Sequence, residues 1–215
     1  LTLMLFRKLT TLLISSIIIL SAAGSVFACA CCVERGYYGR SRVKANSFRT
    51  TLLGDIKIGG RADLYMTEAG FDIIKGLPEI EKYDAGGGTP EFTFTSSFDR
   101  RTWRLNVQAG PGRNGTLVLL MPMHVTMHAA DIDGVDNGLG VSLYKEYSLN
   151  GRVTAGTGIF RSAKAANYHL MFQGRGNGCD EASDFTRWRL EISGPRAQYA
   201  FFGNTLGGTA KLLHP

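Results

Sequence analysis

The four cysteines are the residues whose type and spacing suggest chemistry most directly. Cys29, Cys31 and Cys32 form the run Cys-Ala-Cys-Cys, and Cys179 lies far along the chain in a glycine-rich segment. In an exported protein we expect disulfides, and a bridge from Cys31 or Cys32 to Cys179 would tie the N-terminal segment to the domain. The alternative is a thiolate site, because clustered sulfurs suit Cu(I) or Zn(II). The protein would then handle copper or zinc in the periplasm.

An acidic loop is the second candidate for metal chemistry. Asp131, Asp133, Asp136 and Asn137 lie among glycines in the segment 131–138. Calcium takes several oxygen ligands from a flexible loop, but this spacing is not that of the EF-hand loop. Because Asp, Asn and Gly also build ordinary turns, we expect a turn here, with a Ca²⁺ site as the alternative.

Methionine and histidine alternate in the segment 121–128, which could bind copper. On a strand, His124 and His128 would share one face, and Met123 and Met127 the other. One ion could not use both sets, so we expect a strand whose histidines face outward.

No hydrolytic motif is present. The chain contains neither Gly-x-Ser-x-Gly nor His-Glu-x-x-His, and its glycine-rich segment 154–158 is not followed by a helix pattern. His169 is expected to point outward from a strand. We therefore predict no catalytic residues and no cofactor, and favour a non-enzymatic protein over an enzyme without a recognisable motif.

The first 28 residues have the order of a secretory signal peptide. Arg7 and Lys8 precede an apolar run over 9–20, and small residues follow up to Ala28. The uncharged stretch is long enough to span a membrane, but its small residues favour cleavage. Val-Phe-Ala-Cys29 also resembles the bacterial lipobox, in which the cysteine is acylated. We expect a secreted or periplasmic protein, with a membrane-anchored lipoprotein as the alternative.

Most of the remaining chain has the patterns of β-strands. Period-two alternation or short apolar runs, separated by Gly-rich turn segments, predict roughly nine strands. Asn150-Gly151 is the sharpest hairpin signal, the continuous apolar run after Gly115 predicts a strand buried on both faces, and residues 78–84 favour a short helix. The fold class is therefore all-β, an antiparallel sandwich or an up-and-down barrel. The predicted strands are 61–67, 91–95, 102–108, 115–121, 140–149, 151–160, 167–173, 186–192 and 197–203.

Two tryptophans lie in matching strands. Trp103-Arg-Leu-Asn-Val and Trp188-Arg-Leu-Glu-Ile have the same order, and each is soon followed by Gly-Pro. We expect two equivalent core strands with Trp103 and Trp188 pointing inward. The alternative is a pair of tryptophans that line a cavity.

The length and net charge of the chain bear on the number of domains and on its partners. The 215 residues include 27 glycines and carry a formal net charge of +6, too mild to indicate nucleic acid. We expect one domain after a signal peptide over 1–28, with a Cys-rich segment and first strands over 29–88 and the main antiparallel region over 89–215. The predicted function is ligand binding or a structural role in the cell envelope or outside the cell. The expected partner is a small ligand or an envelope component, with membrane contact only through the signal or a lipid anchor.

Overall fold

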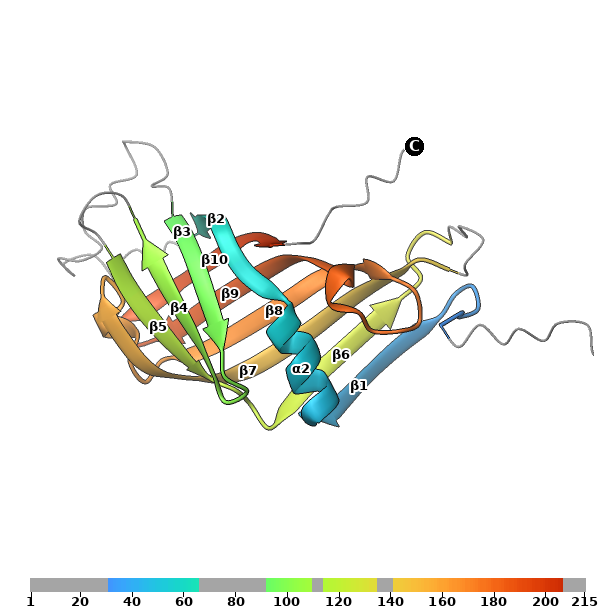
Figure 1. Ribbon diagram of the computed structural model, residues 1–215, viewed down its shortest axis with the longest axis horizontal. Helices are drawn as coiled ribbons and strands as arrows, with labels where there is room; N and C mark the ends of the chain where they lie inside the picture. The colour runs from blue at the N-terminus through green and yellow to red at the C-terminus, as the bar shows by residue number, and fades with distance from the viewer. Residues whose placement is uncertain (1–30, 66–91, 110–113, 135–140, 207–215) are drawn as a thin grey trace, which may run out of the picture.

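The computed structural model describes residues 31–65, 92–109, 114–134 and 141–206. These residues form one antiparallel sheet of ten strands, which confirms the all-β prediction (Figure 1). Helical structure in the same ranges comprises α2 (Ser47–Asp55) and two short 3-10 helices, η1 (Arg161–Ala163) and η2 (Ala182–Asp184). The predicted helix over 78–84 lies outside the described residues. The strands are β1 (Tyr38–Lys44), β2 (Lys57–Tyr65), β3 (Phe92–Phe98), β4 (Thr102–Gln108), β5 (Asn114–Leu120), β6 (His124–Ala130), β7 (Leu143–Gly158), β8 (Asn167–Gly176), β9 (Phe185–Gly194) and β10 (Ala197–Leu206).

Eight of these strands close into a barrel. Their order is β7-β5-β4-β3-β2-β10-β9-β8, and the pairing of β8 with β7 completes the circle. The wall consists of two four-strand meanders, β2 to β5 and β7 to β10, which meet where β5 pairs with β7 and β10 pairs with β2. Of the two predicted architectures, the barrel is therefore the one that forms.

Strand β7 belongs both to the barrel and to a two-strand extension. Its first half pairs with β6 and its second half with β5. Strand β6 therefore leaves the barrel wall, and β1 pairs with it. We call β1 and β6 together the wing.

The continuous β7 shows that the predicted Asn150-Gly151 hairpin is wrong. Both residues lie within the β7–β8 ladder, opposite His169 and Tyr168. The glycine is needed for a different reason, since a Cβ atom at Gly151 would lie 2.6 Å from the ring of Tyr168. Glycine is therefore required at position 151 because the ring of Tyr168 lies close to the backbone, and not because the backbone has a positive φ.

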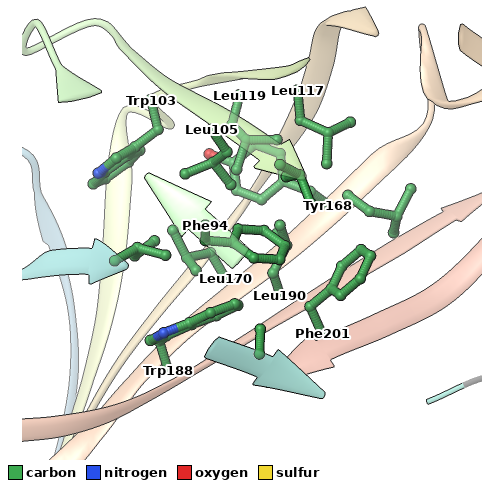
Figure 2. Packing of buried hydrophobic residues seen from close by; sticks show 14 of the residues in the cluster. Phe94, Trp103, Leu105, Leu117, Leu119, Tyr168, Leu170, Trp188, Leu190 and Phe201 are labelled. Atoms are coloured by element: carbon green, nitrogen blue, oxygen red, sulfur yellow. The ribbon is translucent and has the colours of Figure 1, made fainter. Parts of the chain in front are cut away.

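The interior of the barrel is filled by apolar and aromatic side chains (Figure 2). Trp103 and Trp188 are both buried there, on the third strand of their respective meanders. Each tryptophan lies opposite a phenylalanine of the preceding strand, Phe98 for Trp103 and Phe172 for Trp188. The sequence echo therefore marks two equivalent core strands.

The outward-facing side chains of β5 are only partly buried. On β5, Leu117 and Leu119 are buried, but Val118 is only half-buried and Leu120 is exposed. The expectation that this apolar run is buried on both faces is wrong, because none of the described elements forms a second layer over the outside of β5.

Helix α2 connects the wing to β2. The side chain of its N-cap, Asn46, accepts a hydrogen bond from the N–H of Arg49, which satisfies one unpaired donor of the first turn. Leu52 and Leu53 bury one side of the helix. The Nε–H of Arg49 donates to the sulfur of Met127 at 3.1 Å, so α2 lies against the inner face of β6.

Candidate functional site

The cysteines tie the N-terminal segment to the barrel. Cys31 and Cys179 form a disulfide, which confirms one of the two predicted pairings to Cys179. Cys32 is also disulfide-bonded, while Cys29 lies outside the described residues. The N–H of Gly178 donates to the carbonyl of Cys31 at 2.6 Å, which adds a second link at the same place. Because the sulfurs of Cys31 and Cys179 bond to each other, neither is a thiolate ligand.

The candidate calcium loop is only partly described. Asp131 accepts hydrogen bonds from the N–H groups of Gly36 and Gly134, and these bonds lower the pKa of its carboxyl. Asp133 forms an ion pair with Arg175. These oxygens thus bind protein groups, and Asp136 and Asn137 lie outside the described residues. Across the described residues, no three His, Cys, Asp or Glu side chains are grouped closely enough to hold a metal ion.

The predicted arrangement of the 121–128 segment is found only in part, because the strand begins at His124 and Met123 precedes it, 77% exposed. His124 and His128 lie on the outer face of β6, whereas Val125 is buried on the inner face. The ring of His128 contacts Tyr38 edge-on, at 5.1 Å between ring centres. His128 therefore lies against an aromatic ring of β1.

The structure brings together exposed apolar and cationic side chains from three segments at one end of the molecule. Their backbones are joined by two hydrogen bonds, from the N–H of Ala45 to the carbonyl of Met123 at 2.9 Å and from the N–H of Met121 to the carbonyl of Arg101 at 2.7 Å. In Figure 1 the β3–β4 turn, the β5–β6 connection and the start of α2 lie along the same lower edge. We call this end the tip, and it comprises Lys44, Phe48, Arg100, Arg101, Leu120 and Met123.

The apolar members of the tip are unusually open to solvent. Met123 is 77% exposed, Phe48 56% and Leu120 46%. Such side chains gain by leaving water, and their location at one end of the molecule makes this end a candidate interaction surface.

The cations of the tip have no ion-pair partner within the described part of the chain. Lys44, Arg100 and Arg101 are all exposed. The neighbouring carboxylate, Asp99, instead accepts hydrogen bonds from backbone N–H groups of its own turn, which lower its pKa and keep it ionised. Three positive charges therefore outnumber one negative charge beside the apolar side chains.

A Ser–His–Glu constellation lies on the outer face of the barrel, where the sequence predicted no site. The Oγ of Ser148 on β7 is 2.6 Å from the Nε2 of His169 on β8. The Nδ1 of His169 is 3.5 Å from a carboxylate oxygen of Glu191 on β9. The second oxygen of Glu191 pairs with Arg189 at 2.6 Å. This is the order of contacts that activates a serine hydroxyl in many enzymes.

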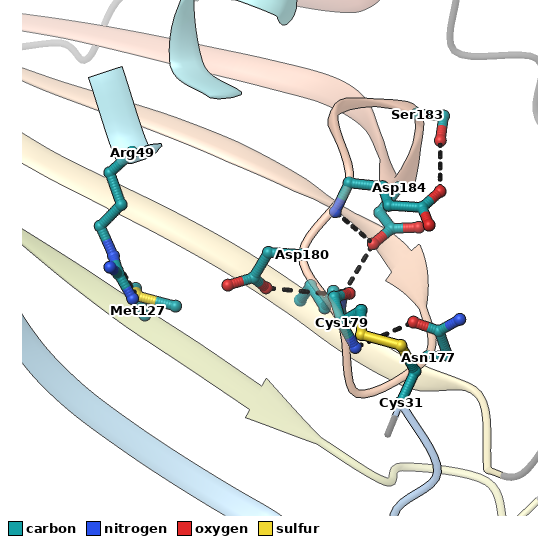
Figure 3. Close-up of polar contacts among 10 residues, drawn as sticks. Cys31, Arg49, Met127, Asn177, Cys179, Asp180, Ser183 and Asp184 are labelled. Carbon is teal, nitrogen blue, oxygen red and sulfur yellow. Dashed lines mark hydrogen bonds and ion pairs between the residues drawn. A yellow bond between two sulfur atoms is a disulfide. The ribbon is translucent and has the colours of Figure 1, made fainter. Parts of the chain in front are cut away.

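A buried ionic cluster lies beneath the segment between β8 and β9 (Figure 3). Lys145, on the inner face of β7, is only 3% exposed. Its Nζ lies 2.7 Å from Asp184 and 3.5 Å from Asp180, and it also donates to the carbonyl of Cys179. The disulfide, the lysine and both aspartates therefore hold the same segment.

The cluster is largely shielded from solvent, with Lys145 buried and the two aspartate side chains 12% and 21% exposed. Burial raises the pKa of the Asp184 carboxyl, although the hydrogen bond from Lys145 opposes the shift. Burial also raises the pKa of Tyr147, and the neighbouring Asp180 carboxylate raises it further by hydrogen bonding and by its charge. The Tyr147 hydroxyl is buried. Partial burial thus disfavours the charged form of both Asp184 and Tyr147.

No protein family, curated protein or solved structure matches this chain. In the described ranges, none of the helices has both the length and the apolar character of a membrane span.

Proposed function

We propose that this protein is an exported, non-enzymatic envelope protein whose tip docks on an acidic lipid surface. The observation that carries the proposal is the tip itself, where exposed apolar side chains lie near cations that have no ion-pair partner among the described residues. An acidic membrane surface offers partners for both kinds of side chain at once.

The two kinds of contact are complementary. Each Lys or Arg held near an acidic leaflet contributes about 1 kcal/mol, so three such residues supply about 3 kcal/mol, or roughly a hundredfold in affinity. The exposed side chains of Met123, Phe48 and Leu120 would enter the boundary between headgroups and acyl chains, where burial of apolar surface contributes about 25 cal/mol per Å². Reversible docking of the folded barrel is the result.

The proposal adds a membrane contact to the expected export, beside the lipid anchor that was the alternative. A single acyl chain binds a membrane only marginally, and a basic patch supplies the second signal that stable attachment needs. The tip would add a contact that does not depend on a lipid anchor.

The experiment is sedimentation of the exported, unacylated protein with vesicles of phosphatidylglycerol or of phosphatidylcholine. We expect binding to the acidic vesicles that weakens at least tenfold when Met123 and Phe48 are both replaced by Ser, and again when Lys44 and Arg101 are both replaced by Gln. Ile132→Ser is the matched apolar control, because Ile132 is 58% exposed at the opposite end of β6. Equal binding by all three variants would show that the tip is not the docking surface.

A second candidate function is acyl-ester hydrolysis at Ser148, which the 2.6 Å contact with His169 favours. With its Nδ1–H held by Glu191, His169 would take the proton of Ser148 as the hydroxyl oxygen attacks an ester carbonyl. It would then return that proton to the departing alcohol, and water would release the acyl group by the same path.

The test is labelling of the folded protein with a fluorophosphonate, followed by peptide mapping. We expect a modified Ser148 whose labelling is lost in His169→Asn and unchanged in Ser193→Ala, which removes an exposed serine of β9. Labelling that is absent, or that persists without His169, would exclude this activity.

A further inference from the structure

The ion pair between Lys145 and Asp184 has the arrangement of two groups that can condense. An amide forms from an amine and a carboxylic acid when the two are in contact, are shielded from water and have a second acid or base within reach. Lys145 Nζ lies 2.7 Å from Asp184 Oδ2, and Asp180 Oδ1 lies 3.5 Å from the same nitrogen. The two reacting residues are far apart in sequence, so the barrel itself brings them together.

The pair is largely buried, although Asp180 beside it keeps 21% of its side chain exposed. Lys145 is buried, and the exposed fraction of the Asp184 side chain is only 12%. The ring of Tyr147 packs on that of Phe185 at 4.7 Å between ring centres, and these residues lie two positions from Lys145 and one from Asp184. Figure 3 shows Asp180 and Asp184 on the same segment as the Cys31–Cys179 disulfide.

Burial of an ion pair favours its conversion to a neutral pair. Removing two charges from water is costly, and transfer of one proton from the ammonium to the carboxylate abolishes both charges. The raised pKa of Asp184 agrees with this direction. A desolvated, neutral lysine is a competent nucleophile.

We propose that Lys145 and Asp184 become joined by an intramolecular amide bond after the chain folds. In the first step a proton passes from Nζ of Lys145 to the Asp184 carboxylate, and Nζ then attacks Cγ of Asp184. A C–N bond forms, the bond from Cγ to the hydroxyl oxygen breaks, and one water leaves with that oxygen, its proton and one proton from the nitrogen. Asp180 takes the proton from the attacking nitrogen and passes it to the departing hydroxyl, which makes Asp180 a catalytic residue. No oxidant, reductant or cofactor is required.

This inference is independent of the docking and the hydrolytic proposals. The new bond would link the inner face of β7 to η2, beside the disulfide that links the N-terminal segment to the same loop. Two covalent links of different chemistry would then hold the segment between β8 and β9. Only the disulfide would open under reducing conditions.

The experiment is the mass of the full exported protein after complete reduction and alkylation, together with peptide mapping. We expect a mass that is one water lower than the mass calculated for the sequence starting at the observed N-terminal residue. Peptide mapping should yield a branched peptide that contains both Lys145 and Asp184. A full mass, with the two peptides recovered separately, would overturn the proposal.

Three variants separate the bond from the fold. Asp180→Asn keeps the shape of the side chain and should show the full mass with an unchanged circular dichroism spectrum. Asp184→Asn should lose ammonia instead of water and end at the same mass as the native protein. Asp133→Asn alters an exposed ion pair elsewhere and should keep the native loss of water. Loss of water that survives in Asp180→Asn at the native rate would contradict the role of Asp180.

Discussion

Removal of the disulfide is expected to lower the stability of the barrel strongly. Cys31 and Cys179 close a loop with a sequence separation of 148 residues, for which loop entropy predicts about 5 kcal/mol. Measured values for single disulfides are commonly about 2–4 kcal/mol, so we expect a loss within that span for the double variant Cys31→Ser, Cys179→Ser. The N–H of Gly178 should also lose protection, since it donates to the carbonyl of Cys31.

Urea unfolding, followed by tryptophan fluorescence, measures this loss. Trp103 and Trp188 are both buried in the barrel and report its opening. The free energy of unfolding should fall, and the denaturant slope should rise because the unfolded chain becomes less compact. A loss below about 1 kcal/mol would refute the entropic reasoning and would mean that the N-terminal segment contributes little to the barrel.

Three further outcomes follow from the fold. Gly151→Ala should cost about 1–3 kcal/mol in urea unfolding, because the added methyl group would meet the ring of Tyr168; an unchanged midpoint would mean that the ring moves freely. Leu170→Ala, in the centre of the core, should cost about 2–5 kcal/mol in the same assay. The carboxyl of Asp131 should titrate below 3.8 by NMR, since it accepts the N–H of Gly36. A lowered native pKa means that its contribution to stability is present above the unfolded value and lost as the pH falls; Asp131→Asn should remove that acid dependence.

The barrel could be predicted because burial of one sheet face imposes a strict alternation. Trp103, Leu105 and Val107 point inward on β4 and the residues between them outward, as the sequence predicted. The same rule placed His169 on the outside, with Tyr168 and Phe172 inside. Alternation also accounts for the wrong hairpin prediction, because it continues through Asn150, where the turn preference of Asn-Gly predicts a break.

Two elements lacked a clear apolar pattern. Strand β1 is an exposed edge strand, and its Arg40, Arg42 and Lys44 face solvent, so it offers almost no alternation. Helix α2 buries mainly Leu52 and Leu53, too few residues to show a helical period. Only the capping side chain of Asn46 could have indicated its start.

The candidate sites depend on which residues of neighbouring strands face each other, and this register could not be predicted from the sequence. Ser148, His169 and Glu191 lie on three neighbouring strands, and they meet only because of how β7, β8 and β9 are paired. Lys145 stands at an inward position where alternation predicts an apolar residue, and this departure was the one available signal of the buried cluster.

The most direct test of the docking proposal is the partition of the native protein between buffer and vesicles of two compositions, at one ionic strength. We predict that binding to phosphatidylglycerol vesicles is at least tenfold tighter than binding to phosphatidylcholine vesicles, and that the difference shrinks as salt is added, because the cations of the tip are exposed to solvent. Equal partition into both kinds of vesicle, or no binding to acidic vesicles at low salt, would contradict the account.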